Sequence, residues 1–170
     1  MWPIISFTDG LMHTIGVWTD SKFRHVVSNI LAYFKDSTVL KDQLTTMDLP
    51  PVTILLMADT TIMYTNIHNS PVLNQISQYF NVNKTKYQHL PVDNMLRSLR
   101  LMMKNNIFHL GDSHWLQLKH TAMGTPPAPT YPIVFYSVFE WFLHEIFWNI
   151  LFLNRWFIDY LMVLWKKYIE

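Results

Sequence analysis

The stretch that decides the fold is the apolar run VTILLMA at residues 52–58, which ends at Asp59. Two prolines precede this run and a polar cluster follows it, and its short length and β-branched residues favour a strand. A continuous apolar run of this kind predicts a strand that is buried on both faces. Asp59 then stands at the end of that strand, where burial of a carboxylate is costly unless something pairs with it.

A second aspartate has a similar setting near the C-terminus. Residues 156–165 (WFIDYLMVLW) are apolar and β-like on both sides of Asp159. Hard oxygen ligands from two separate strands can hold Mg²⁺, and two-metal sites serve phosphoryl and nucleotidyl transfer. From spacing alone, the simpler interpretation is that each aspartate caps a turn and faces water.

The rest of the chain is mostly helical by its pattern. Apolar residues at helical spacing predict helices within residues 10–34, 40–49, 70–80, 91–104 and 133–150. Between the last two, the loop Gly111-Asp112 predicts a tight hairpin. In that hairpin His109 faces His114 and Phe108 faces Trp115. Two histidines are too few for a zinc site, so we interpret them as a solvated cross-strand pair.

The composition bounds the function. A chain of 170 residues is long enough for one domain with a core, and the absence of cysteine excludes a disulfide scaffold, thiolate metal sites and a cysteine nucleophile. A net charge of +1 predicts no strong nucleic-acid field, so a nucleic-acid function would need local patches. The N-terminus does not have the pattern of a signal peptide, and charges interrupt the apolar residues 133–165, so we expect no transmembrane helix.

Three stretches carry a resemblance to a known family. Residues 58–67 (ADTTIMYTNI) resemble the palm motif DVTSLYTNI, residues 121–129 (TAMGTPPAP) resemble the loop motif TAMGTPxAP, and Phe157-Ile158-Asp159 resembles an aromatic-x-Asp-Asp motif. In this order the motifs resemble the reverse transcriptase domain of Penelope-like retroelements. Residues 104–108 with the hairpin, and Pro3-Ile4-Ile5-Ser6 of the fingers, extend the similarity over nearly the whole chain.

The resemblance implies an α+β fold, the partial fingers–palm of a reverse transcriptase, with an antiparallel palm sheet and helices packed on one face. Residues 1–170 would form a single partial reverse transcriptase domain, with a finger remnant at 1–50 and the palm with an inserted hairpin at 51–170. Because the chain stops just after the second palm hairpin, we expect neither a thumb nor an endonuclease domain.

The resemblance also implies roles for individual residues. Asp59 and Asp159 would be the catalytic carboxylates and, with the backbone carbonyl of Thr60, would hold two Mg²⁺ ions. Tyr64 would stand against the sugar 2′ position of the incoming nucleotide. The other implied contacts are Met123, Gly124 and Thr125 to the nucleotide, and Thr121, Ala122, Pro126 and Lys104 to the template and primer. The implied partners are an RNA or DNA template–primer and dNTPs, with no membrane; the oligomeric state stays open.

The chain departs from the family pattern at several positions. Tyr160 replaces the second aspartate of the aromatic-x-Asp-Asp motif, Trp2 and Trp156 stand where basic residues are common, and His120 replaces a glycine. We therefore expect an RNA-directed DNA polymerase by descent, from a retrotransposon, that is inactive or very weak. Its location by resemblance is nuclear or cytoplasmic. The alternatives are a non-catalytic nucleic-acid-binding or structural remnant and, less favoured, a small membrane-associated protein.

Overall fold

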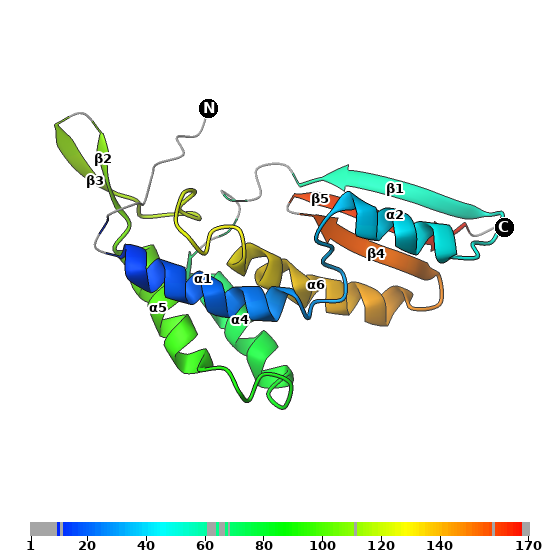
Figure 1. Ribbon diagram of the computed structural model, residues 1–170, viewed down its shortest axis with the longest axis horizontal. Coiled ribbons are helices and arrows are strands. Elements are labelled where there is room, and N and C mark those ends of the chain that lie inside the picture. The colour runs from blue at the N-terminus through cyan, green and yellow to red at the C-terminus, as the bar shows by residue number, and fades with distance from the viewer. Residues whose placement is uncertain are drawn as a thin grey trace. The chain divides into compact units, whose positions relative to one another are not determined.

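The structure is a computed structural model that describes residues 10, 12–60, 64, 67, 69–110, 112–157 and 159–167. Trp2, the predicted finger motif Pro3-Ile4-Ile5-Ser6 and Gly111 of the hairpin loop lie outside the described residues, as do 61–63, 65, 66 and 158 of the palm motifs. The elements in chain order are α1 (His13–Val27), α2 (Ser37–Thr46), β1 (Thr53–Asp59), α4 (Asn69–Val82), α5 (Val92–Lys104), β2 (Ile107–Leu110), β3 (Ser113–Leu116), α6 (Tyr131–Phe147), β4 (Leu151–Phe157) and β5 (Tyr160–Lys166) (Figure 1).

These elements make a mixed α+β fold with two antiparallel sheets, which confirms the predicted class. The chain divides into two compact units, Met1–Asn29 with Ile62–Val138 and Ile30–Thr61 with Phe139–Glu170. The first unit contains α1, α4, α5 and the β2–β3 hairpin, and the second contains α2 and the three-stranded sheet. The helix α6 begins in the first unit and ends in the second. The division into a finger remnant and a palm stays a prediction.

The sheet of the second unit has the order β1-β5-β4, with both strand pairs antiparallel. Helix α2 begins after Asp36, whose carboxylate accepts hydrogen bonds from the amides of Thr38 and Val39, so that the side chain acts as an N-cap. This helix covers one face of the sheet (Figure 1). The buried residues there are Leu153, Met162 and Leu164, and those of α2 and the following loop that pack on them are Leu40, Leu44, Met47 and Leu49.

The prediction that β1 is buried on both faces is wrong. Leu55 and Met57 are 55% and 66% exposed, and Ile54 and Leu56 are exposed as well. The cause is topological: β1 is an edge strand with only β5 beside it, and the packed core lies on β4 and β5. A continuous apolar run indicates a strand, but it does not distinguish a central strand from an edge strand.

The first helix ends at Val27, several residues earlier than the apolar pattern predicts. The side chains of Ser28 and Asn29 both donate to the carbonyl of His25, which occupies an acceptor at the end of the helix. The chain then runs along the outer edge of β4. There the Trp156 amide donates to the carbonyl of Ala32 at 2.6 Å, and the Phe34 amide donates to the carbonyl of Trp156 at 3.2 Å.

Helices α1 and α5 form the core of the first unit with α4. The predicted apolar face of α5 is confirmed, since Met95, Leu99 and Met102 are buried. Gly16 of α1 marks the closest approach, because an added Cβ would lie 2.9 Å from Met102 Cε and 3.0 Å from the ring of Pro126. This glycine lets α1, α5 and the loop at 121–130 meet.

The predicted hairpin is confirmed residue by residue. Strands β2 and β3 pair Leu110 with Ser113, and the register then sets His109 opposite His114 and Phe108 opposite Trp115. The rings of the two histidines are 4.9 Å apart, centre to centre.

Candidate metal and nucleotide site

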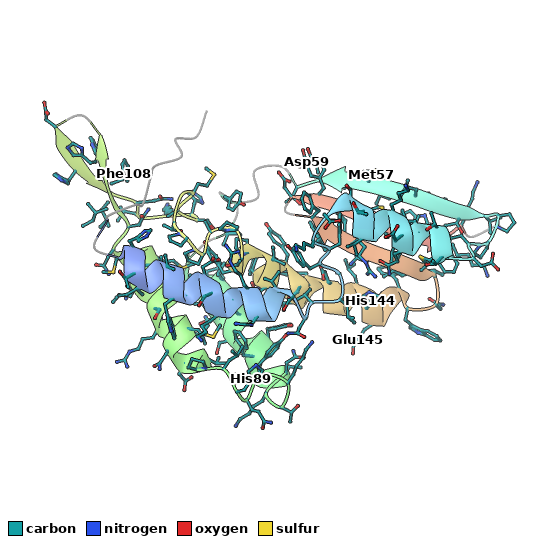
Figure 2. All side chains as sticks on the ribbon, viewed as in Figure 1. Met57, Asp59, His89, Phe108, His144 and Glu145 are labelled. Carbon is teal, nitrogen blue, oxygen red and sulfur yellow. The ribbon has the colours of Figure 1, made fainter. Side chains whose placement is uncertain are left out.

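The antiparallel pairing of β1 and β5 brings the positions of the three predicted metal ligands, Asp59, Thr60 and Asp159, to the same end of the sheet. In the register, Asp59 lies opposite Tyr160, and the Thr60 amide donates a hydrogen bond to the carbonyl of Asp159 at 2.8 Å. Asp59 is the last residue of β1, and Figure 2 shows its side chain at that end of the strand. Two positions that are about a hundred residues apart in sequence are thus joined by one backbone contact.

The same hydrogen bond fixes which side chains are neighbours. Since Thr60 and Asp159 form a hydrogen-bonded position of the ladder, Asp59 and Tyr160 form the adjacent non-hydrogen-bonded pair. In such a pair the Cα atoms are about 4.5 Å apart and the two side chains share one face of the sheet. Tyr160, which is 54% exposed, therefore stands beside the Asp59 carboxylate.

Two of the three predicted metal ligands at this end of the sheet are carboxylates. Asp59 is exposed, Asp159 is half-buried, and the carbonyl of Thr60 belongs to the same short stretch. Mg²⁺ is commonly bound through one or two carboxylates, with waters and substrate phosphates completing the octahedron. Among the described residues, no group of three or more histidine, aspartate or glutamate side chains is placed to hold a metal.

The loop at 121–130 belongs to the first unit. The side chains of two of its threonines form hydrogen bonds within that unit. Thr121 and Thr125 are buried. Tyr131 donates its hydroxyl hydrogen to Thr121 Oγ1, and Thr125 Oγ1 donates to the carbonyl of Ala122 at 2.9 Å. The amides of both threonines also donate within the unit, to the carbonyls of Tyr64 and Ala122. Of the predicted contact residues in this loop, Gly124 is exposed, and Ala122, Met123 and Pro126 are half-buried.

The remaining predicted contacts also lie in the first unit. Tyr64 is half-buried, and its carbonyl accepts a hydrogen bond from the Thr121 amide at 3.0 Å, so these two positions are brought together. Burial raises the pKa of the Tyr131 hydroxyl, which keeps the group neutral and able to donate to Thr121. Lys104 is exposed in the last turn of α5. The structure thus groups Asp59, Thr60 and Asp159 in one unit and the loop contacts in the other.

Two residues of the loop region have left-handed backbone conformations. Gly124 has a φ of 101°, and His120 has a φ of 69°, the one positive value of a non-glycine residue in the described part of the chain. Glycine adopts this region without steric cost, whereas a residue with a Cβ is disfavoured there by roughly 1–2 kcal/mol. His120 therefore occupies a position whose backbone favours glycine.

Replacing His120 by glycine should stabilise the protein by about 0.5–1 kcal/mol. Glycine removes the steric cost of the left-handed conformation in the folded state. This gain exceeds the loss of stability that comes from the greater conformational entropy of glycine in the unfolded chain. Urea unfolding of the wild-type protein and His120→Gly measures the difference. The matched control is His109→Gly in strand β2, which should destabilise; equal losses in both variants would contradict the interpretation of His120.

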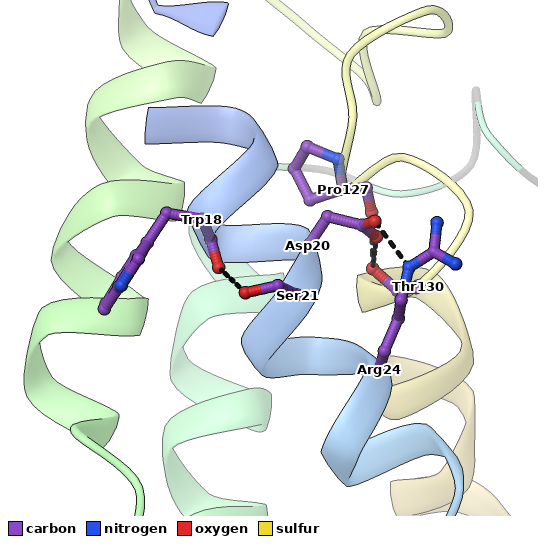
Figure 3. A network of polar contacts seen from close by, with 6 residues as sticks. All are labelled: Trp18, Asp20, Ser21, Arg24, Pro127 and Thr130. Atoms are coloured by element: carbon purple, nitrogen blue, oxygen red, sulfur yellow. Dashed lines mark hydrogen bonds and ion pairs between the residues drawn. The ribbon is translucent and has the colours of Figure 1, made fainter. Parts of the chain in front are cut away.

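A polar network around the buried Asp20, which the sequence analysis did not single out, holds this loop to α1. Asp20 is 7% exposed; its Oδ1 accepts from Thr130 Oγ1 at 2.9 Å and its Oδ2 accepts from Arg24 Nε at 2.7 Å (Figure 3). The Thr130 hydroxyl also lies 3.2 Å from the carbonyl of Pro127. The spacing of Asp20 and Arg24, one helical turn apart, was the available signal. The pairing to Thr130 depends on the tertiary fold.

A second charged residue missed from sequence lies in the second unit. Glu140 of α6 is 6% exposed, and burial raises the pKa of its carboxyl to about 8 although the Arg155 charge opposes the shift. Arg155 of β4 donates from Nε to Gln43 Oε1 of α2 at 3.0 Å, and burial lowers its pKa. The signal in the sequence was an acid within an apolar stretch of the helix.

Comparison of the chain with protein-family models and with curated proteins gives no match. No helix among the described residues has both the length and the apolar character of a membrane span.

Proposed function

We propose that this chain is a reverse transcriptase-like nucleotidyltransferase by descent, with the fingers–palm fold, and that its catalysis is impaired. The observation that supports the proposal is the β1–β5 register, since Asp59 and Asp159 come from the two motifs that resemble palm motifs and the backbone joins their positions. A palm of this kind needs both carboxylates at one end of an antiparallel pair.

The chemistry of the proposed site is nucleotidyl transfer. A bound Mg²⁺ ion would neutralise the phosphates of the incoming nucleotide and orient them toward the primer hydroxyl. Asp59 and Asp159 would hold that ion, and the Thr60 carbonyl is a further oxygen donor. Because Tyr160 contributes no negative charge, a second ion that activates the primer hydroxyl would be held weakly. We therefore expect extension at or near background.

The backbone of the loop supports the proposal independently. His120 has a positive φ at the position where the resembled motif has glycine, and Gly124 has a positive φ at the glycine of the TAMGT sequence. Both positions adopt the backbone region that glycine favours, and the His120 side chain is a later departure under this proposal.

Asp59→Asn should weaken the binding of a divalent ion by at least about tenfold, because it removes a full negative charge from the two-carboxylate set. The measurement is a Mn²⁺ titration followed by paramagnetic broadening of amide NMR signals, in which Thr60 and Tyr160 should broaden first. The matched control is Asp48→Asn, an aspartate of the same unit that lies outside the β1–β5 end, which should change nothing.

Mg²⁺-dependent primer extension on RNA and DNA templates completes the test. Unimpaired extension by the wild-type chain would contradict the proposed impairment. Equal Mn²⁺ binding by the wild-type protein and Asp59→Asn would contradict the metal site itself. Loss of the metal site together with intact nucleic-acid binding would favour the second candidate, a non-catalytic nucleic-acid-binding protein.

A further inference from the structure

The β2–β3 hairpin exposes aromatic and apolar side chains. All four residues of β3 are exposed, and Trp115 is 55% exposed. Phe108 stands opposite Trp115 on one face, while His109 and His114 share the other. Ile107, Leu116 and Leu118 are also exposed on or beside the hairpin, so its apolar surface is a patch and not a single side chain.

The base of this hairpin is fixed and flanked by cations. Asn106 and Gln117 join the two strands through a side-chain hydrogen bond of 2.9 Å and a backbone hydrogen bond of 3.0 Å. Lys104 lies two residues before Asn106, and Lys119 lies two residues after Gln117; both lysines are exposed. The hairpin therefore carries a positive charge at its base and aromatic rings along its length.

The surrounding charge is locally biased. Residues 97–120 contain four basic residues and a single acidic one, whereas the whole chain has a net charge of only +1. The four basic residues, all of them exposed, are Arg97, Arg100, Lys104 and Lys119. This excess of positive charge favours binding to a phosphate backbone. It disfavours pairing with the same surface of a second copy, because the two positive charges would repel each other.

We propose that the hairpin is a platform for single-stranded nucleic acid, with a base stacked on Trp115 and the adjacent phosphates near Lys104 and Lys119. A single strand is the matching partner because its bases are free to stack, whereas those of a duplex are already stacked. The inference rests on the proposed function, because the platform would be the surface by which such a protein holds a nucleic-acid strand. Strand binding at the platform requires neither a metal ion nor nucleotide transfer.

The test is fluorescence anisotropy of a fluorescein-labelled dT12 or rU12 strand, titrated with the full chain in EDTA. Trp115→Ala should weaken binding about tenfold, as expected for the loss of one stacked base. Trp148→Ala is the matched control, since Trp148 is 76% exposed between α6 and β4 of the other unit, and it should bind like the wild-type protein.

The charge contribution has a separate readout. The logarithm of the association constant falls linearly with the logarithm of the salt concentration. In the double variant Lys104→Ala/Lys119→Ala the magnitude of this slope should fall by about 1.4, or roughly 0.7 for each lost phosphate contact of a single strand. The circular dichroism spectra of all variants should match the wild type, because every altered side chain is exposed.

Two other outcomes would contradict the proposal that the hairpin binds single-stranded nucleic acid. Binding that neither Trp115→Ala nor the lysine variant changes would place the nucleic-acid surface elsewhere on the chain. Absence of single-strand binding, with a dimer that Trp115→Ala converts to a monomer in light scattering, would make the hairpin a contact between two copies. Since EDTA removes the metal, failure of the Asp59→Asn experiment leaves this test unaffected, and failure here leaves the metal site unaffected.

Discussion

Glu140→Gln should stabilise the protein by several kcal/mol at pH 8 and have little effect at pH 5. Glu140 is almost fully buried in α6, and burial raises the pKa of its carboxyl from 4.5 to about 8. Each unit of such a shift corresponds to about 1.4 kcal/mol, so the full effect is at most about 5 kcal/mol. Glutamine keeps the neutral shape of the protonated acid and has no charge to bury.

The sign of the pH dependence follows from proton counting. Between pH 4.5 and about 8 the folded protein keeps a proton on Glu140 that the unfolded chain has lost. The free energy of unfolding therefore falls as the pH rises through this window and levels off above the folded pKa. In Glu140→Gln this fall should disappear. The nearby Arg155 limits the penalty, since its charge favours the ionised carboxylate.

Urea unfolding from pH 5 to pH 9 measures this difference. Glu145→Gln is the matched control, because Glu145 lies on the same helix and is exposed (Figure 2). The difference between wild type and Glu140→Gln should grow with pH, while that for Glu145→Gln should stay small throughout. Parallel stability curves for wild type and Glu140→Gln would show that the carboxyl ionises freely in the folded protein.

The features that the sequence predicted correctly are the ones that local chemistry determines. The two-residue loop after Leu110 fixes the hairpin register by itself, so the pairing of His109 with His114 follows from the amino-acid sequence alone. The apolar face of α5 follows from helical spacing in the same way. The apolar runs before and after Asp159 likewise form two strands of one antiparallel pair.

The features that the sequence did not predict depend on what each segment meets in the fold. The run at β1 has the pattern of a buried strand, yet its exposure follows from its place at the sheet edge. Asp20 and Arg24 have the spacing of a surface ion pair on a helix. Asp20 is nevertheless buried, and its carboxylate there accepts a hydrogen bond from Thr130, 110 residues away. The same holds for Glu140, because the pattern of α6 does not show which face is covered.

Tyr160→Asp should raise divalent-ion affinity by at least about tenfold and Mg²⁺-dependent primer extension on the order of 100-fold over the wild-type chain. The substitution restores the aspartate pair of the resembled motif. It also places a third carboxylate beside Asp59, because the two positions form a non-hydrogen-bonded cross-strand pair. With Asp59 and Asp159, the variant would have three carboxylates at this end of the sheet, which is the donor set that the proposal requires for two ions.

The Tyr160→Asp substitution should also change the stability of the protein, which can be measured without any catalysis. Without metal, the carboxylates at 59 and 160 repel each other across the strands, which should destabilise the protein by about 0.2–1 kcal/mol. Saturating Mg²⁺ or Mn²⁺ should reverse this loss, because an ion that binds only the folded state stabilises it in proportion to the logarithm of its saturation. Thermal unfolding with and without the ion measures both effects.

Tyr160→Asn separates charge from size in this experiment. Asparagine has nearly the volume of aspartate and no negative charge, so it removes the tyrosine ring without adding a charged metal ligand. We expect no metal-dependent stabilisation and no gain in extension for this variant. If Tyr160→Asn and Tyr160→Asp respond equally to the ion, the missing carboxylate is not what impairs the site. If only Tyr160→Asp responds but extension stays absent, the metal site is intact and the defect lies in holding the template and primer.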